Sequence, residues 1–295
     1  MSENYQQLLD ATIQHLQELK NHGARFVDVA PETLAALDKA PRVSMGNPPV
    51  ANRAESASTR PGNEIRPPTP SPEKPTPAPS AAISPAERQV KEQAMAELRA
   101  RALVCVKCSH LAATRKSVVF SVGDPASPLM FVGEAPGADE DAQGEPFVGK
   151  AGQLLTRIIQ TMGFTRDTVY IANILKCRPD TPGQSAGNRK PTPEEMQTCL
   201  PYLQAQIDII KPRVLVALGG VAIEGLLGKT VGITRLRGQW QTYRDIPLMP
   251  TYHPAYLLRN QALSEKRKVW EDMLQVLEKL GQPISEKQRG YFLKG

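Results

Sequence analysis

From residue 84 onward, the pattern of hydrophobic and polar positions alternates between two periods. Short apolar runs of strand length are separated by longer stretches in which apolar residues recur at helical spacing. The runs that predict strands lie at 129–133, 168–175, 213–219 and 248–252. The stretches that predict helices begin at 84, 151, 192, 221 and about 264. Because strands alternate with helices, we expect an α/β fold of three layers, α/β/α, with a central, mainly parallel four-stranded sheet.

The first 83 residues do not continue this alternation. One apolar stripe of helical period occupies 5–21, and a second short helix is expected at 32–39. Residues 41–83 are rich in proline mixed with Ser, Thr, Ala and Glu, and such a segment buries too little apolar surface to offset its chain entropy. We therefore expect a helical N-terminal extension at 1–40 and a disordered linker at 41–83.

The main domain is expected to begin at a helix start signal. Ser84 is followed by proline at the first helical position and by Glu87, which together form a capping box. A second capping box begins at Thr192, and Gly163 suits the end of the helix that begins at 151. The expected domain covers 84–281, and 282–295 forms a C-terminal tail.

Composition narrows the class of protein. Hydrophobic residues make up 40% of the 295 residues, enough for a core, and the net charge of +6 weakly favours a polyanionic partner. The chain has no apolar run of about 20 residues that would span a membrane. Because it also lacks a basic start followed by an apolar stretch, we expect a cytoplasmic protein with no membrane contact.

The four cysteines carry chemistry of their own. Cys105 and Cys108 form a CxxC pair, and Cys177 and Cys199 lie in the same half of the chain. Disulfides are unusual in the cytoplasm. Four thiolates suit either a [4Fe–4S] cluster or zinc, and their spacing does not decide between these two.

Three further motifs directly follow predicted strands. A turn at 133–137 follows the first strand and precedes Phe147, which is held between turn residues. Asn173 lies near the end of the second strand, and His253 follows the last one. Ligands of parallel sheets bind at the carboxyl ends of the strands, so these three residues are candidates for one site. Each of them also has a structural interpretation, as a tight turn, a satisfied buried amide and a loop histidine.

Together these motifs resemble a known family. The stretches GEAPG, DED and GEPFVGKAGQLL within 133–155, YIANILKCRP at 170–179 and HPAYLLR at 253–259 closely resemble the type 4 uracil-DNA glycosylases, which carry a [4Fe–4S] cluster. The resemblance covers roughly 95–281. It implies an enzyme that flips uracil out of DNA and hydrolyses its N-glycosidic bond.

The resemblance also implies roles for individual residues. Phe147 would stack on uracil, Asn173 would hydrogen-bond its Watson–Crick edge, and His253 would donate towards its O2 atom. Main-chain N–H groups of the turn after the first strand would donate further hydrogen bonds to uracil. Three residues in the segment that follows His253 would hold the DNA open. The four cysteines would hold the cluster, with a structural role. The turn residues are Gly133, Ala135 and Gly137, and the DNA-opening residues are Leu257, Leu258 and Arg259.

The residue that orients the attacking water stays open. In related glycosylases of another type an aspartate stands at the position of Ala135, and this chain lacks that carboxylate. Glu134 and Glu140 are the nearest replacements, and either could instead cap loop amides. Adjacent apolar residues such as Leu257 and Leu258 on a loop would have no core to join and would make a wedge between bases.

Two alternatives to catalysis remain. The chain could be a non-catalytic DNA-binding module that kept the cluster, or a relative that becomes trapped covalently on abasic DNA. The trapping branch has Gln where this chain has Ala135 and carries a histidine-bearing insert, whereas residues 178–191 contain no histidine. We expect single- or double-stranded uracil-containing DNA as the partner of a monomer, and a possible protein partner for the N-terminal helix.

Overall fold

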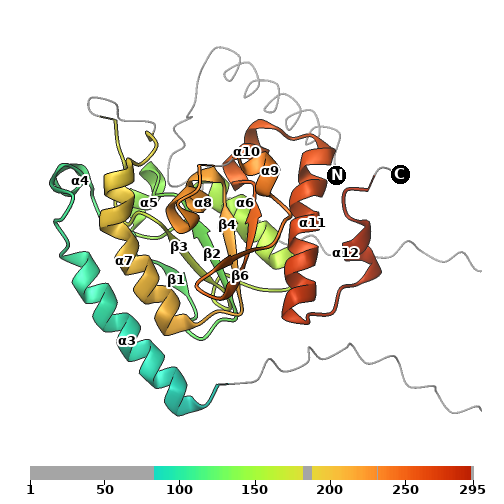
Figure 1. The fold of residues 1–295 in the computed structure, drawn as a ribbon, viewed down its shortest axis with the longest axis horizontal. Coiled ribbons are helices and arrows are strands. Elements are labelled where there is room, and N and C mark those ends of the chain that lie inside the picture. The colour runs from blue at the N-terminus through green and yellow to red at the C-terminus, as the bar shows by residue number, and fades with distance from the viewer. Residues whose placement is uncertain (1–82, 182–187, 231, 294–295) are drawn as a thin grey trace, which may run out of the picture. The chain divides into compact units, whose positions relative to one another are not determined.

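The structure is a computed structural model that describes residues 83–181, 188–230 and 232–293. The expected N-terminal extension and nearly all of the linker lie outside the described residues. Its centre is a six-stranded sheet of order β1-β3-β2-β4-β6-β5 (Figure 1). The strands are β1 (Val122–Gly123), β2 (Leu129–Gly133), β3 (Tyr170–Asn173), β4 (Val214–Leu218), β5 (Gln241–Tyr243) and β6 (Ile246–Thr251).

The four central strands confirm the expected parallel sheet. β3, β2, β4 and β6 pair in parallel, in that order. The short edge strands β1 and β5 pair antiparallel to them and were not expected from the sequence. Neither shows a clear apolar period, because β1 has two residues and β5 three, of which only Tyr243 is buried.

Helices cover both faces of the sheet, which confirms the three-layer fold (Figure 1). On one face α3 (Pro85–Leu103), α4 (Ser109–Thr114), α7 (Pro193–Ile210) and α8 (Gly220–Leu227) pack against the strands. On the other face lie α6 (Lys150–Thr161) and α11 (Leu263–Leu280). The remaining short helices are α5 (Ala138–Gln143), α9 (Ile233–Leu236), α10 (Pro254–Arg259) and α12 (Glu286–Gly290).

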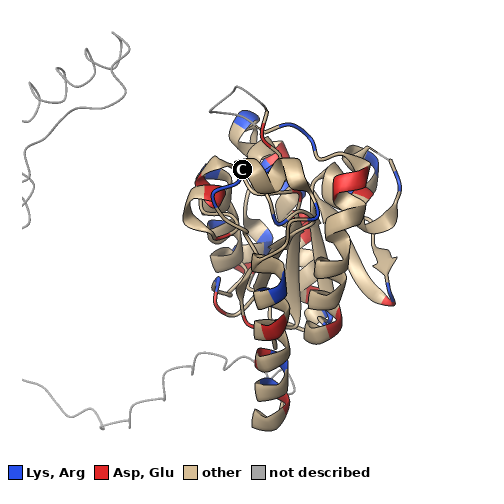
Figure 2. Ribbon diagram, turned by 90° about the vertical axis from the view of Figure 1, so that its left-hand side faces the viewer, with Lys and Arg blue, Asp and Glu red and all other residues tan. Residues whose placement is uncertain are grey.

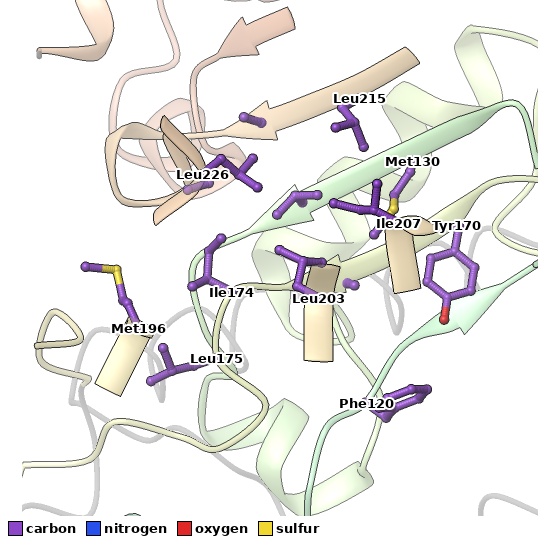
Figure 3. Packing of buried hydrophobic residues seen from close by; sticks show 14 of the residues in the cluster. Phe120, Met130, Tyr170, Ile174, Leu175, Met196, Leu203, Ile207, Leu215 and Leu226 are labelled. Atoms are coloured by element: carbon purple, nitrogen blue, oxygen red, sulfur yellow. The ribbon is translucent and has the colours of Figure 1, made fainter. Parts of the chain in front are cut away.

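Alternating residues of each strand supply the two cores. In β2, Met130 and Val132 join the core under α7, which Figure 3 shows from close by, whereas Leu129 and Phe131 join the core under α11. A strand that is buried on both faces must be apolar at every position, and all five residues of β2 and of β4 are buried.

Both expected capping boxes are present at the helix starts. The Ser84 side chain accepts from the Glu87 N–H at the start of α3, and Thr192 does the same with Glu195 at α7. The C-terminal tail contains α12, which was not expected. No helix of the described residues is long and apolar enough to cross a membrane.

Lys and Arg alternate with Asp and Glu along α3, and both signs are interspersed over the rest of the described ribbon (Figure 2). In this view the positively charged residues are not confined to one element. Net charge alone does not mark a DNA-binding face here, and the site has to be found from its chemistry.

Candidate active site

Four of the candidate residues meet at the carboxyl edge of the sheet, where β2, β3 and β6 end. Gly133 is the last residue of β2 and pairs in register with Asn173, the last residue of β3. His253 follows β6 and caps the N-terminus of α10. The rings of His253 and Phe147 lie 5.6 Å apart, tilted by 31°. The fold therefore brings together four residues that the sequence places up to 120 positions apart.

Gly133 makes this close approach possible. A Cβ atom at this position would lie 2.4 Å from Oδ1 of Asn173 and 2.4 Å from Cζ of Phe147. Both distances are far below van der Waals contact, so a larger residue would fill the space beside the amide and the ring. The glycine therefore lets the amide of Asn173 and the ring of Phe147 both approach the end of β2.

The amide of Asn173 is buried without a partner for its oxygen. The residue is 2% exposed, and its Oδ1 atom has no hydrogen bond within the part of the chain that the structure describes. Leaving a buried acceptor unpaired costs about 1–3 kcal/mol, and most buried polar groups are satisfied. An orphaned oxygen at the end of a rigid strand is therefore an acceptor available to a ligand.

Phe147 is held in an unusual backbone conformation. Its φ of 57° lies in the left-handed region, which residues with a Cβ seldom adopt. Gly152 packs directly against it, since a Cβ there would lie 1.8 Å from the Phe147 carbonyl oxygen. Arg166 donates from Nη1 to that same oxygen at 3.0 Å and from Nη2 to the Pro146 oxygen at 2.7 Å. These contacts fix the position of the ring.

The proton of the His253 ring is placed by its neighbour. Nδ1 accepts a hydrogen bond from the Ala255 N–H at 3.2 Å, so the neutral ring carries its proton on Nε2. Burial, together with the positive charge of Arg259, lowers the pKa of His253 to about 4. The ring is therefore neutral at neutral pH and presents Nε2–H as a donor.

Glu140 caps main-chain N–H groups, which is one of the two roles that the sequence left open for it. One carboxylate oxygen accepts from the N–H groups of Val148 and Gly149 at 3.0 Å, and the other accepts from Gly137 at 3.0 Å. The side chain thereby ties the turn after β2 to the segment that carries Phe147. The N–H of Gly137 is occupied, so the structure does not support its expected donation to a ligand.

Glu134 is in a different environment. It directly follows β2 and is half-buried, and its carboxylate has no hydrogen bond among the described residues. Burial raises the pKa of Glu134, the positive charge of Lys190 opposes the rise, and Glu224 adds to it. Of the two carboxylates considered from the sequence, it alone is free to bind water. The adjacent Ala135 packs against the core on the α7 side of the sheet.

The four cysteines lie near one another, around the start of α4. Cys108 caps α4, Cys177 follows β3 and Cys199 lies in α7. Burial raises the pKa of the Cys108 thiol, and the nearby Cys177 and Cys105 add to the rise. Burial also raises the pKa of Cys199 to about 11. Such thiols ionise readily only when a cation replaces the proton.

The chemistry of this donor set fits a metal or cluster site. Within residues 83–181, 188–230 and 232–293, no three Cys, His, Asp or Glu side chains are already spaced to bind one metal ion. Donors nevertheless point at the sulfurs. Arg115 donates to Sγ of Cys177 at 3.0 Å and to the Cys105 carbonyl at 2.7 Å. The N–H of Lys176 donates to Sγ of Cys199 at 3.3 Å, and N–H···S bonds of this kind stabilise thiolates.

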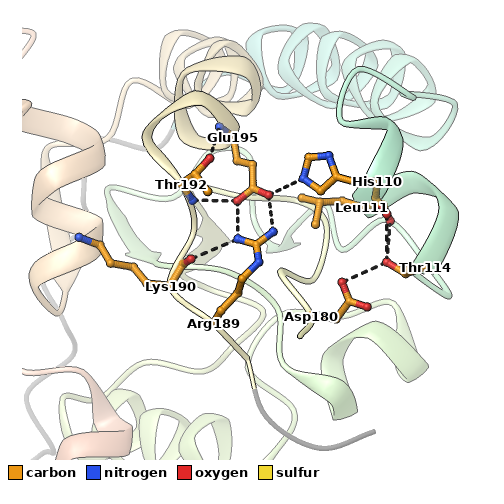
Figure 4. Close-up of polar contacts among 8 residues, drawn as sticks. All are labelled: His110, Leu111, Thr114, Asp180, Arg189, Lys190, Thr192 and Glu195. Atoms are coloured by element: carbon orange, nitrogen blue, oxygen red, sulfur yellow. Dashed lines mark hydrogen bonds and ion pairs between the residues drawn. The ribbon is translucent and has the colours of Figure 1, made fainter. Parts of the chain in front are cut away.

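A buried carboxylate links the elements that carry these cysteines (Figure 4). Glu195 of α7 accepts from Arg189 at 2.9 and 2.5 Å and bonds Nε2 of His110 in α4 at 2.6 Å. The hydrogen bond from Arg189 is the main reason that the pKa of Glu195 falls to about 2. The network holds α4 to α7, and so keeps Cys108 close to Cys199.

Comparisons with known proteins identify the family of the chain. The family model of the uracil DNA glycosylase superfamily matches residues 120–274. The type-4 uracil-DNA glycosylase of Thermotoga maritima is 43% identical over 188 residues, covering 62% of this chain and 93% of the relative. That of Sulfurisphaera tokodaii is 38% identical over 208 residues, covering 68% of this chain and 90% of the relative. The chain belongs to the type-4 uracil-DNA glycosylase family. A type-5 uracil-DNA glycosylase of Pyrobaculum aerophilum is 27% identical over 190 residues, covering 53% of this chain and 80% of the relative.

One expectation for this type-4 chain is wrong. Leu257 and Leu258 were expected on a loop with no core to join, but they lie in the helix α10. Leu257 is buried and packs with Tyr252 and Val269 in a small core of its own. Leu258 is half-buried and Arg259 is exposed. Of the three residues expected to hold the DNA open, Leu258 and Arg259 therefore reach the surface and Leu257 does not.

Three residues of the type-4 site escaped the sequence analysis. Arg166 lies 19 positions after Phe147, and no local pattern links an arginine to a carbonyl at that separation. Gly152 and Gly219 have no room for a side chain, because other residues of the site lie close to their backbone. Gly219 has a φ of 90°, and a Cβ there would lie 3.0 Å from Cβ of His253. The glycine after an apolar strand was a signal that could have suggested Gly219.

Proposed function

We propose that the residues around Gly133 form a pocket that excises uracil from DNA by hydrolysing its N-glycosidic bond. Membership of the type-4 family supports the reaction. The observation that carries the assignment to this pocket is the unpaired Oδ1 of Asn173 beside Phe147. A base has to leave the helical stack before an enzyme can reach its glycosidic bond, so the pocket has to recognise a flipped base.

Base recognition would use the two flat groups on either side of Gly133. The ring of Phe147 would stack on uracil. Oδ1 of Asn173 would accept from the uracil N3–H, which satisfies the orphaned oxygen, and the amide nitrogen would donate to O4. Cytosine presents an acceptor at N3 and a donor at its amino group, so it would face the same amide with both positions mismatched.

His253 would stabilise the leaving group. Cleavage of the glycosidic bond leaves negative charge on uracil and positive charge on the sugar. The Nε2–H of the neutral ring would donate to uracil O2 as charge builds there, because Nδ1 is already occupied by the Ala255 N–H. A donor that is fixed before the reaction needs no reorganisation during it.

Glu134 would orient the attacking water. Glu140 is bonded to three main-chain N–H groups, and Ala135 offers no carboxylate. Glu134 is half-buried at the end of β2 with no competing hydrogen bond among the described residues. Its carboxylate could accept a proton from water while the negative charge also stabilises the cationic sugar.

The [4Fe–4S] cluster would be held by Cys105, Cys108, Cys177 and Cys199. When bound, it would supply a rigid cross-link between the segment before α4, the end of β3 and α7, rather than a step of the reaction. Cys177 lies four residues after Asn173, so this cross-link would also fix the strand end that reads the base.

DNA contacts would come from α10, next to His253. Arg259 would bind phosphate and Leu258 would enter the space of the flipped base. We further propose that the domain acts as a monomer on uracil-containing DNA and that the helix expected at 5–21, outside the described residues, binds a protein partner. These parts of the proposal stand apart from the chemistry of the pocket.

The test is incubation of the holoenzyme with single-stranded DNA that contains one uracil. We expect free uracil and an abasic strand, and we expect Asn173→Ala to abolish both. Binding without release of uracil would favour the non-catalytic DNA-binding module. A stable protein–DNA adduct on abasic DNA would favour the trapping relative.

A further inference from the structure

Lys176 places a positive charge in the interior of the domain. The residue is 2% exposed and lies between Asn173 and Cys177. Its ammonium donates to the Asn173 carbonyl at 2.9 Å and to Oε1 of Gln206 at 2.6 Å, and it lies 5.7 Å from the centre of the Phe120 ring. All three partners are neutral.

A buried ammonium without a counterion is costly. Within the described ranges, no carboxylate lies within ion-pair distance of the Lys176 ammonium. Moving a charge from water into the interior costs several kcal/mol even after relaxation, and neutral hydrogen bonds offset only part of this. Buried charges are normally paired or bound to a metal site. We therefore expect a negatively charged group near this ammonium.

The cysteines would supply negative charge, because their thiols lose their protons when they bind a cluster. Cys177 is the next residue, and the N–H of Lys176 itself donates to Sγ of Cys199. Gln206, which binds the ammonium, lies on α7 two turns after Cys199. The main chain of Lys176 therefore contacts Cys199, one of the residues that would hold the cluster. Its ammonium lies on the face of the sheet that α7 covers.

We propose that Lys176 is the buried counterion of the [4Fe–4S] cluster and that its charge raises the reduction potential of that cluster. The inference rests on the proposed function, in which the four cysteines hold this cluster. A cluster held by four thiolates is negative overall, and its potential depends on net charge, hydrogen bonds to sulfur and burial. The reduced cluster is the more negative state, so a nearby cation stabilises it more than the oxidised state.

Lys176 is thus a positioning and tuning residue rather than a catalytic one. Its ammonium also holds the carbonyl of Asn173. In the measured step one electron passes between the cluster and an electrode, and no bond forms or breaks.

The experiment compares holoenzyme variants by protein-film voltammetry at neutral pH. We expect Lys176→Met to shift the equilibrium of the one-electron couple at least tenfold towards the oxidised form, which is 59 mV to lower potential. Lys176→Arg keeps the charge and should stay within threefold of the wild type. Lys91→Met is the matched control. Lys91 is partly buried and, like Lys176, donates to a carbonyl, which is that of Ile210 at the C-terminal end of α7.

Gln206→Glu keeps the test decisive if Lys176→Met does not fold. It places a carboxylate 2.6 Å from the ammonium without removing the lysine, and should lower the potential in the same direction. A change below threefold in Gln206→Glu and in any folded Lys176→Met overturns the inference, as does wild-type protein that holds zinc instead of iron. Uracil release is assayed on the same samples, so a failure of the proposed function appears separately, as wild-type protein without release.

Discussion

Arg166 donates a 3.0 Å hydrogen bond to the carbonyl oxygen of Phe147 and so holds the ring that would stack on the flipped base. The arginine is half-buried, and burial lowers its pKa. The same carbonyl needs a glycine at position 152, because a Cβ there would lie 1.8 Å from its oxygen. The conformation of Phe147, with its φ of 57°, therefore depends on two residues that never touch the base.

Arg166→Met should lower kcat/KM for uracil release about ten- to a hundredfold, because a displacement of about 1 Å at a stacking group can cost that much. The measurement is steady-state kinetics on a uracil-containing oligonucleotide. Arg88→Met is the control, since Arg88 forms an exposed ion pair with Asp124, and such pairs contribute about 0–1 kcal/mol. Wild-type kinetics in Arg166→Met would show that Phe147 does not need this support.

Asn173→Asp tests base recognition. The carboxylate keeps an acceptor but loses the donor for uracil O4, so uracil release should fall strongly while cytosine becomes relatively less disfavoured. Each unpaired buried polar group costs about 1–3 kcal/mol, which allows discrimination of several hundredfold in the wild type. The measurement is the uracil-to-cytosine rate ratio in single-stranded DNA. Asn173→Ala should lose activity without that change, and an unchanged ratio in Asn173→Asp would make the amide purely structural.

His253 should stay neutral far below the ordinary pKa of a histidine. With its pKa near 4, the ring should show protonated Nε2 and unprotonated Nδ1 by nitrogen NMR at pH 5–8, with the signal assigned through His253→Gln. The unfolded chain would take up a proton near pH 6.5, before the folded one does. The free energy of unfolding should therefore fall as pH decreases from about 6.5 to about 4. A His253 titration near pH 6.5 would contradict the burial and the donor role together.

The cysteines predict the metal content. Anaerobically purified protein should be brown and contain about four iron atoms per chain with negligible zinc, as expected for an all-thiolate [4Fe–4S] site. Cys199→Ser should lose iron and unfold at a lower temperature, because its sulfur joins α7 to the end of β3. The measurements are metal analysis and thermal unfolding. One equivalent of zinc without iron would replace the cluster by a zinc site.

Leu257 and Leu258 should behave differently when shortened. Leu258→Ala should reduce cutting of double-stranded DNA more than of single-stranded DNA, because parting a base pair costs a few kcal/mol that single strands do not require. Leu257→Ala should instead lower the free energy of unfolding by about 2–5 kcal/mol, as expected for a buried leucine. The ratio of rates on the two substrates and chemical denaturation measure these effects. Equal losses of rate on both substrates would remove Leu258 from base opening.

The sequence by itself determined the alternating pattern and its consequences. Apolar runs of strand length predict the four parallel strands, because strands buried on both faces tolerate few polar residues. Capping at Ser84 and Thr192 is equally local, since a cap bonds an N–H group three residues away. The convergence of Gly133, Asn173 and His253 followed from the rule that parallel strands end at one edge.

Only the tertiary structure decided the contacts between distant segments. Arg166 reaches Phe147, and the buried ammonium of Lys176 reaches Gln206 over 30 positions, and neither pairing leaves a periodic trace in the sequence. Leu257 looked like an exposed wedge because a short helix after a proline resembles a loop in sequence. The fold instead supplied Tyr252 and Val269 as its core. Glu140 and Glu134 are equivalent as acids, and their difference arises because only one of them meets three free N–H groups.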